Sequence, residues 1–227
     1  MAATERLPAG WTVEHVTTTG STNADLVATA DRRPHRSVLV TDHQTAGRGR
    51  LDRRWDAPPG ANLLASLLFH DVPPQPSELT RRVGLAAIAA AAEAAGVRAT
   101  LKWPNDVLVD GSKLAGILAQ RTAAGSVVVG IGLNVRWAPD GAARLGDDVR
   151  PRAVLAALLR AFDALPADIE PVYREHLTTL GRLVRVERSA DVLEGTAVDV
   201  DATGRLVVVD PSAVTHHVDV GDVVHVR

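Results

Sequence analysis

The chain has 227 residues, 46% of them hydrophobic, and a formal net charge of −2, a size that suits one medium domain with an appendage or two modest domains. It contains no cysteine, which excludes disulfides, thiolate metal sites and a cysteine nucleophile. No apolar run approaches the roughly 20 residues of a membrane span, and the slightly acidic balance argues against a general nucleic-acid binder. Because the start also lacks the basic-then-apolar pattern of a secretion signal, we expect a cytoplasmic protein.

Apolar periodicity and turn residues predict a succession of strands and helices up to about residue 181. In chain order we expect a strand over 11–17, a helix capped by Ser21 or Thr22 and running to Ala30, strands over 37–41 and 62–69, a helix over 77–95, strands over 98–103, 106–109, 113–121 and 127–135, and helices over 151–164 and 169–181. Gly96 should end the long helix, and the Asp110-Gly111 pair should turn a hairpin. Strict strand–helix–strand alternation is missing, so we predict an α+β fold, a mixed sheet with helices on one face.

The character of the sequence changes from Leu183 onward. Short valine-rich runs are separated by turn residues at 201–204, 210–212 and 220–222, a pattern that is typical of a small all-β barrel. We therefore expect two domains, residues 1–181 and 182–227.

The segment 44–60 predicts a long exposed loop, and such loops are often functional. It contains Gly-Arg-Gly-Arg at 47–50. The glycines let the backbone approach a ligand closely, and Arg48 and Arg50 offer fork-shaped donors to phosphate or carboxylate. It is not a Walker loop, which ends in Gly-Lys-Ser/Thr, nor a Rossmann fingerprint, since no helix follows. The same residues also suit a solvated, flexible turn.

A second motif, Lys-Trp-Pro-Asn-Asp, occupies residues 102–106. Pro104 within strand-like sequence indicates an edge or a bulge, and the hairpin that follows should return Lys113 to this neighbourhood. A lysine, the Asn105 amide and the Asp106 carboxylate would then lie together at one cleft. The alternative is a surface hairpin with solvated lysines.

Two further segments carry unusual residues. Gly130 and Gly132 interrupt a buried strand, which indicates that something packs closely against its backbone, and Asn134 needs polar partners in that apolar setting. A β-bulge with a satisfied asparagine is the alternative. The Gly-Ser-Thr-Asn string at 20–23 is either a plain helix cap or a grip on the polar head of a ligand.

Together these strings resemble the biotin protein ligase family, also called biotin–acetyl-CoA-carboxylase ligases. The matching strings, in the family's order and spacing from about Trp11 to Arg227, are Gly-Ser-Thr-Asn, Gln-x-Ala-Gly-Arg-Gly-Arg, Lys-Trp-Pro-Asn-Asp, Lys-Leu-Ala-Gly-Ile-Leu and Gly-Ile-Gly-x-Asn-Val. The resemblance implies a catalytic domain like that of class II aminoacyl-tRNA synthetases, followed by an SH3-like domain. It implies an ATP-dependent enzyme that makes biotinyl-5′-AMP from biotin and ATP, with Mg²⁺ held mainly by the ATP phosphates. The biotin would then pass to a lysine of a biotin carboxyl carrier domain.

The resemblance also assigns roles to residues. The expected biotin-binding residues are Ser21, Thr22, Asn23, Gln44, Arg48, Gly49, Arg50, Lys113 and Gly116. The expected ATP-binding or adenylate-binding residues are Arg48, Arg50, Trp55, Asn105, Lys113 and Asn134. Within these sets, Ser21, Thr22 and Asn23 would hold the ureido ring with Gln44, while Trp55 would pack on adenine and Asn134 would read its edge. The expected catalytic group is Lys113, Arg48, Arg50 and Asp106, in which Asp106 is a candidate to orient or deprotonate the acceptor lysine.

Two departures from the family pattern qualify the expectation. Many relatives continue the arginine loop with a further glycine and a basic residue, whereas this chain has Leu51 and Asp52 followed by Arg53 and Arg54. Relatives that repress transcription carry an N-terminal winged helix, and this chain begins only about ten residues before its first strand. We therefore expect a monofunctional ligase that binds neither DNA nor membrane and is a monomer or a homodimer.

Other functions remain open from the sequence. A lipoate ligase or lipoyl transferase would share the fold and parallel chemistry, although the Gly-Arg-Gly-Arg and Lys-Trp-Pro-Asn-Asp strings favour biotin. A non-catalytic biotin sensor would need an output domain, and a basic-loop nucleic-acid module conflicts with the charge balance. We do not expect His216 and His217 to bind one metal ion together, because the side chains of adjacent strand residues point to opposite faces of a sheet.

Overall fold

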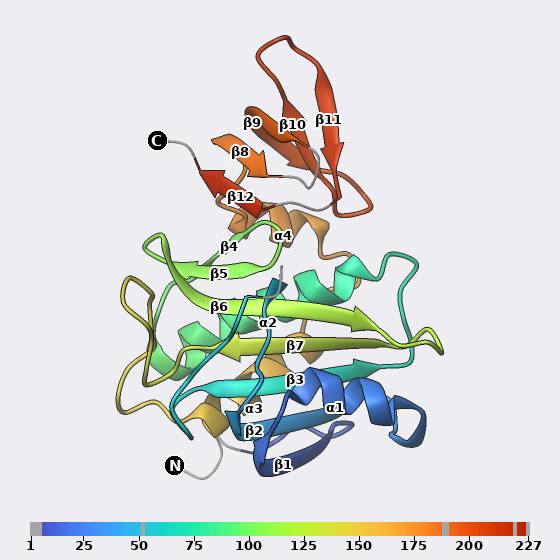
Figure 1. Cartoon of the computed structure of the whole chain (residues 1–227), viewed down its shortest axis with the longest axis vertical. Helices are drawn as coiled ribbons and strands as arrows, with labels where there is room; N and C mark the ends of the chain where they lie inside the picture. Colours follow the sequence, from blue (N-terminus) through green and yellow to red (C-terminus); the bar gives the residue numbers. More distant parts are fainter. Residues whose placement is uncertain (1–5, 51–52, 188–190, 220–221, 226–227) are drawn as a thin grey trace.

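The structure, a computed structural model, describes residues 6–50, 53–187, 191–219 and 222–225. Leu51 and Asp52 of the expected loop, and residues 220–221 of the last expected turn, lie outside these ranges. The described chain forms a large sheet with its helices and a smaller C-terminal sheet above it in Figure 1.

The large sheet is mixed, as predicted. Its seven strands are β1 (Thr12–Thr19), β2 (Ser37–Gln44), β3 (Leu63–Phe69), β4 (Thr100–Lys102), β5 (Asp106–Val109), β6 (Ser112–Arg121) and β7 (Val127–Leu133). Their order is β1-β2-β3-β7-β6-β5-β4. β1 runs parallel to β2, and every other neighbouring pair is antiparallel.

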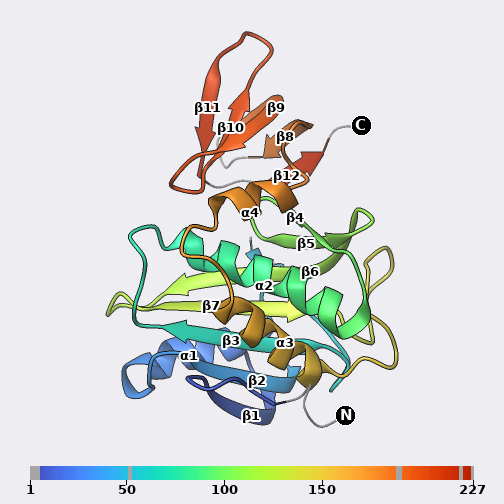
Figure 2. The ribbon, with the colours of Figure 1, turned by 180° about the vertical axis from the view of Figure 1, so that it is seen from behind.

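The central strands are apolar on both faces, so both faces need cover. Every residue of β3 is buried, and so is nearly every residue of β7. The long helices α2 (Ser77–Ala95) and α3 (Pro151–Asp163) cover one face with the main core (Figure 2). α2 ends at Gly96, whose left-handed φ of 67° matches the predicted stop.

The short helix α1 (Thr22–Thr29) lies on the opposite face, which the expectation of helices on one face did not include. Its Leu26 packs against Leu39, Leu68 and Val128, the outward side chains of three neighbouring strands. α1 covers only part of that face. The uncovered part is the floor of the cavity described below.

The fourth helix is shorter than predicted. The pattern suggested a helix over 169–181, whereas α4 spans Glu170–His176. The chain leaves the helix because the next residues pair with the edge of β4, where the Thr178 N–H donates to Leu101 O at 2.9 Å. Gly181 then donates to Ala197 O at 2.8 Å and so joins the second sheet. Tertiary pairing therefore replaced the last turn of the predicted helix.

The C-terminal part is a five-stranded antiparallel sheet, in agreement with the predicted small all-β unit. Its strands are β8 (Leu183–Glu187), β9 (Val192–Val200), β10 (Leu206–Val209), β11 (Thr215–Val218) and β12 (Asp222–His225), in the order β11-β10-β9-β8-β12. Alternate residues such as Val184, Val186 and Leu193 are buried, which gives the sheet its inner face. We propose the boundary at residue 181 as the division between two domains.

His216 and His217 bind different partners. His216 Nε2 lies 2.8 Å from a carboxylate oxygen of Asp210, and His217 Nδ1 lies 2.8 Å from one of Asp201. Throughout the ranges that the structure describes, there is no cluster of three potential metal-ligating side chains. No described helix has the length and apolar character needed to cross a bilayer.

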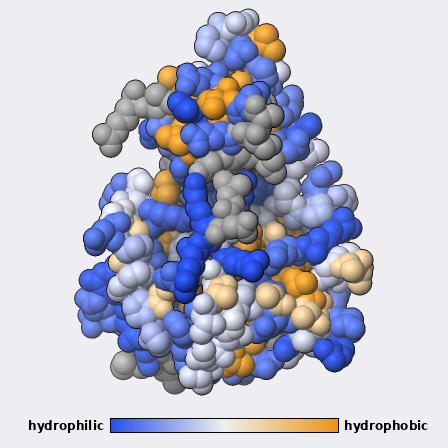
Figure 3. Space-filling view, in the orientation of Figure 1, coloured by the Kyte–Doolittle hydropathy of each residue, from blue (hydrophilic) through white to orange (hydrophobic). Residues whose placement is uncertain are grey.

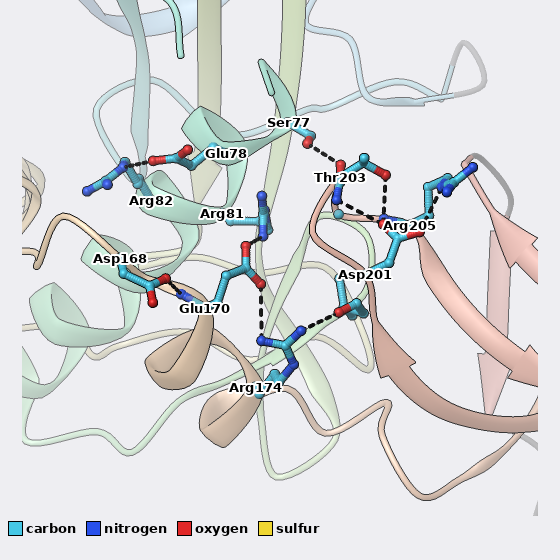
Figure 4. A network of polar contacts seen from close by, with 12 residues as sticks. Ser77, Glu78, Arg81, Arg82, Asp168, Glu170, Arg174, Asp201, Thr203 and Arg205 are labelled. Carbon is cyan, nitrogen blue, oxygen red and sulfur yellow. Dashed lines mark hydrogen bonds and ion pairs between the residues drawn. The ribbon is translucent and has the colours of Figure 1, made fainter. Parts of the chain in front are cut away.

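Charged side chains connect the two sheets at α4. Arg81 on α2 is almost fully buried and forms an ion pair with Glu170, which also faces Arg174 (Figure 4). Arg174 in turn donates to Asp199 Oδ1 at 2.7 Å and to Val200 O at 2.6 Å on the second sheet. That hydrogen bond holds the pKa of Asp199 below its usual range.

Candidate active site

A cavity of about 280 Å³ opens on the face of the large sheet that carries α1. All thirteen residues expected at a ligand site line it, namely Ser21, Thr22, Asn23, Gln44, Arg48, Gly49, Arg50, Trp55, Asn105, Asp106, Lys113, Gly116 and Asn134. They come from the start of α1, three strands and three loops that are far apart in the sequence. In Figure 3, strongly hydrophilic side chains gather over the middle of this face. The structure thus brings the set together, and the role of each residue toward a ligand stays a prediction.

Three glycines on β6 and β7 make the floor of the cavity bare. A Cβ atom built on Gly130 would lie 2.2 Å from Asn23 Oδ1, and one built on Gly132 would lie 2.4 Å from Trp55 Cε2. Beside them, a Cβ on Gly116 would lie 3.2 Å from Trp55 Cζ3. Real Cβ atoms essentially never approach within 3.0 Å, so Asn23 and Trp55 pack directly on the backbone of Gly130 and Gly132. The prediction that something packs closely against the glycine-containing strand is confirmed.

One end of the cavity is a neutral polar cluster at the start of α1. Ser21 caps the helix, with its Oγ accepting from the Ala24 N–H at 3.5 Å. Gln44 Oε1 accepts from the Thr22 N–H at 2.9 Å, and Asn23 Nδ2 donates to Leu118 O at 3.0 Å. The motif at 20–23 is therefore both a helix cap and part of the cavity wall.

Ser66 joins this cluster from behind and was missed by sequence reasoning. Its Oγ lies 2.6 Å from Asn23 Oδ1 and 2.7 Å from Thr22 Oγ1. The signal was present, because Ser66 is the one hydroxyl residue in the apolar run of β3. Buried hydroxyls need partners, but the sequence does not say which segment supplies them.

The other end of the cavity is charged. The hairpin between β5 and β6, turned by Asp110 and Gly111 with φ angles of 49° and 81°, places Lys113 Nζ 2.7 Å from Asp106 Oδ1. The predicted return of Lys113 to the 102–106 segment is confirmed. The same ammonium lies 5.7 Å from the centre of the Trp55 ring.

The arginine loop folds back over this charged end. Gly49 N–H donates to Arg53 O at 2.6 Å, and the Trp55 N–H donates to Gly47 O at 3.0 Å. These bonds make the described ends of the loop a narrow turn. Arg50 Nη1 donates to Asn105 Oδ1 at 3.3 Å, which anchors the loop to the Lys-Trp-Pro-Asn-Asp segment.

Asn134 is satisfied within the protein, as the alternative interpretation held. Its Nδ2 donates to Ala143 O at 3.0 Å and to Lys113 O at 3.4 Å, and its Oδ1 accepts from Asn62 Nδ2 at 3.2 Å. Both amide protons are therefore committed. Reading of an adenine edge by Asn134 stays a prediction and would draw on the remaining lone pair of Oδ1.

The charge of the cavity wall is strongly positive. The cationic side chains that line it are Arg48, Arg50, Arg53, Arg54 and Lys113, and the carboxylates are Asp56 and Asp106. Five cations against two anions favour a ligand with several negative charges. The sequence motifs did not single out Asp56, nor the apolar lining residues Pro139 and Ala142.

Comparisons with known sequences agree with this site. A family model described as "Biotin/lipoate A/B protein ligase family" matches residues 15–136, and one described as "Biotin protein ligase C terminal domain" matches residues 179–226. A biotin–[acetyl-CoA-carboxylase] ligase of Mycobacterium tuberculosis is 41% identical over 248 residues, which cover 96% of this chain and 91% of the relative. The bifunctional ligase/repressor BirA of Bacillus subtilis is 40% identical over 113 residues, which cover 47% of this chain and 35% of that protein.

Solved structures show the same fold. Biotin protein ligase from Aquifex aeolicus, in complex with biotin and ATP, superposes with a TM-score of 0.81 at 23% identity, covering 95% of this chain and 99% of that one. The Leishmania major enzyme, in complex with biotinyl-5-AMP, gives a TM-score of 0.68 at 20% identity, with 94% and 100% covered. The first family model covers more than half of the chain and the M. tuberculosis relative aligns with nearly all of it. This chain therefore belongs to the biotin protein ligase family.

Proposed function

We propose that this protein is an ATP-dependent biotin–protein ligase that forms biotinyl-5′-AMP and then transfers biotin to a lysine of an acceptor protein. The observation that carries the proposal is the division of one cavity into a neutral polar end and a cationic end. Biotin has the matching form, with a cyclic urea at one end and a carboxylate at the other. The relatives named as biotin ligases, and the Aquifex complex with biotin and ATP, support the same conclusion.

The polar end is suited to a urea. Gln44 Oε1 accepts from the Thr22 N–H, so the amide nitrogen Nε2 of Gln44 points away from Thr22. This nitrogen carries two N–H donors, and no hydrogen-bond partner for it lies in the part of the chain that the structure describes. Thr22 Oγ1 and Ser21 Oγ add oxygens that accept hydrogen bonds. A urea presents one acceptor carbonyl between two N–H donors, so both kinds of group find a partner. The dithiolane ring of lipoate has no such groups and would leave these atoms unpaired.

The cationic end is suited to adenylate formation. A carboxylate oxygen of biotin attacks the α-phosphorus of ATP, and the bond from this phosphorus to the β-phosphate bridge oxygen breaks as pyrophosphate leaves. Two anions must meet, and charge builds on the phosphoryl oxygens. Lys113, Arg48 and Arg50 would neutralise that charge, since positioning and electrostatics dominate phosphoryl transfer.

Mg²⁺ fits this site as a companion of the triphosphate. The cavity offers the carboxylates of Asp56 and Asp106, of which Asp56 is paired with Arg54 and Asp106 with Lys113. Mg²⁺ in nucleotide sites is usually held by one or two carboxylates together with substrate phosphates. When bound, the ion would neutralise phosphate charge, with Asp56 or Asp106 as its protein ligand.

The second step requires a neutral amine and a dry mixed anhydride. The acceptor lysine nitrogen attacks the acyl carbon, the bond from that carbon to the AMP oxygen breaks, and the amine gives up one proton and keeps the other as the amide N–H. Asp106 would orient that amine or take a proton from it, once Lys113 engages the substrate. The turn that carries Arg48 and Arg50 would keep water from the anhydride until the acceptor arrives.

The proposed acceptor is a biotin carboxyl carrier domain, in keeping with the carboxylase named for the M. tuberculosis relative. The requirement for ATP makes the cytoplasm the proposed compartment.

The test is incubation with ATP, Mg²⁺ and biotin, with and without a carrier domain. We expect pyrophosphate and enzyme-bound biotinyl-AMP without the acceptor, and one biotinylated lysine with it. A parallel reaction with lipoate should give neither product. Lipoyl transfer at a rate equal to that of biotin would contradict the assignment.

A further inference from the structure

Ser66 lies behind the polar end of the cavity. It sits in the middle of β3 with no exposed surface, directly in register with Gly130 of β7, which is itself in register with Leu118 of β6. Thr22 and Asn23 line the cavity in front of it. Its hydroxyl is therefore sealed from solvent and touches the two residues that would meet the ligand.

The direction of each hydrogen bond in this cluster is fixed by one carbonyl. Leu118 O can only accept, so the Asn23 amide must turn its nitrogen toward it, at 3.0 Å, and its oxygen toward Ser66. Ser66 must then donate its single hydroxyl proton to Asn23 Oδ1, at 2.6 Å. Its oxygen is left as an acceptor for the Thr22 hydroxyl at 2.7 Å.

Thr22 is thereby made an acceptor toward the cavity. The single hydroxyl proton of Thr22 goes to Ser66 Oγ, which is the nearer of its two possible acceptors. The other, Gln44 Oε1, lies 3.1 Å from Thr22 Oγ1 and accepts from the Thr22 N–H instead. The lone pairs of Thr22 Oγ1 remain for an incoming N–H group. A hydroxyl free to rotate would present either a proton or a lone pair, but this one is committed.

We propose that Ser66 is a positioning residue for biotin recognition, which orients the Thr22 hydroxyl as an acceptor for a ureido N–H and locks the Asn23 amide beside it. The inference rests on the proposed function and deepens it. It names a residue that lies behind Thr22 and Asn23 and contributes to the selectivity of the cavity for a urea. Without Ser66, the Thr22 hydroxyl would be free to turn its proton toward Gln44 Oε1 or toward the cavity, and Asn23 Oδ1 would lose its donor.

The test compares Ser66→Ala with Ser37→Ala by isothermal titration of the full-length chain. Ser37 is an equally buried serine on the neighbouring strand β2, and its Oγ donates to Pro34 O at 2.8 Å, away from the cavity. We expect the Kd for biotin to rise about tenfold in Ser66→Ala, the effect of one good hydrogen bond, and to stay unchanged in Ser37→Ala. Desthiobiotin, which keeps the cyclic urea but lacks the sulfur ring, should lose affinity by the same factor, and the Kd for ATP should not change.

The result that overturns the proposal is a folded Ser66→Ala protein with wild-type affinity for biotin, or one that loses ATP affinity by the same factor. If this variant does not fold, Ser66→Cys decides, because it keeps the volume with a weaker donor and should show a smaller loss specific to the urea. Failure of the wild-type protein to bind biotin would instead contradict the proposed function, so the two failures are distinguishable.

Discussion

Lys113 Nζ lies 2.7 Å from Asp106 Oδ1, across the hairpin that joins β5 to β6. We propose that this pair puts a proton donor and a proton acceptor at the point where the carboxyl group of biotin would meet the α-phosphate. Lys113 is 40% exposed at its side chain and Asp106 is 22% exposed, so a ligand can reach the ammonium and release the carboxylate. The first prediction concerns that carboxylate.

Asp106→Asn should slow transfer to the acceptor more than adenylate formation. The amide keeps the shape of the carboxylate but cannot take a proton from the lysine amine, and general-base loss typically costs about 10²-fold or more. Single-turnover transfer from preformed biotinyl-AMP measures the step directly. Asp110→Asn is the matched control, because it changes a carboxylate on the same hairpin at a left-handed position that asparagine tolerates. Transfer at the wild-type rate by Asp106→Asn would remove this residue from the role.

Arg48→Ala should make the enzyme release its intermediate. Arg48 lines the cavity and its backbone pairs with that of Arg54 in the turn over the charged end. Removing the guanidinium weakens the hold on the phosphate and opens the site to water. Free biotinyl-AMP in the filtrate, and labelling of lysines on unrelated proteins, would both rise. The exposed Arg98, in the connection between α2 and β4, provides the control substitution Arg98→Ala. Undiminished retention of adenylate by Arg48→Ala would count against a guarding role.

Gly132→Ala should displace the Trp55 indole, because the new Cβ would lie 2.4 Å from Trp55 Cε2. We expect the specificity constant for ATP to fall about tenfold or more, as small misplacements in a closed site are costly. The double-mutant cycle with Trp55→Ala tests the cause. In the Trp55→Ala background the clash disappears, and Gly132→Ala should then have little further effect. Additive losses in the double variant would show that Gly132 acts through something other than Trp55.

Arg81→Met should destabilise the connection between the two sheets. Arg81 is buried at 4% exposure against Glu170, whose carboxylate is 23% exposed and also faces Arg174, so loss of the Arg81 partner should cost about 1–3 kcal/mol. Urea unfolding measures the loss. The double variant Arg81→Met/Glu170→Gln also removes the carboxylate that has lost its Arg81 partner and should recover part of the stability. Equal stabilities of the single and double variants would contradict a cost that arises from the charge.

Folding stability should fall as the pH drops below neutrality because of His35. Burial lowers the pKa of His35 below its usual value of 6.5, and its Nδ1 accepts from the His70 N–H at 3.1 Å. The folded state therefore prefers the neutral ring. The stabilisation is complete above the unfolded pKa and is lost as the pH falls through the folded pKa.

The measurement is the melting temperature between about pH 8 and pH 5. His35→Asn keeps an acceptor without a titrating group, so its profile should be flatter than that of the wild type. His176→Asn, at a partly exposed site on α4, should follow the wild-type curve. Parallel profiles for the wild type and His35→Asn would exclude this histidine as the source.

The sequence by itself determined the features whose causes lie within a few residues. The Ser21 cap, the Gly96 stop and the Asp110-Gly111 turn each depend on a local hydroxyl or a positive φ, and all three form as predicted. The motif strings also selected residues that meet in one cavity, because each string carries its own chemistry.

Only the tertiary structure decided which distant groups meet. Leu177 and Thr178 leave α4 because the edge of β4 offers better partners than a last helical turn. α1 lies on the face opposite α2 because the central strands are apolar on both sides. In the sequence, Ser66 cannot be distinguished from other buried strand residues. The fold places it beneath Thr22 and Asn23, where its hydroxyl contacts both. Local propensity cannot encode such partners, since the free energy of a buried hydrogen bond depends on what lies across the core.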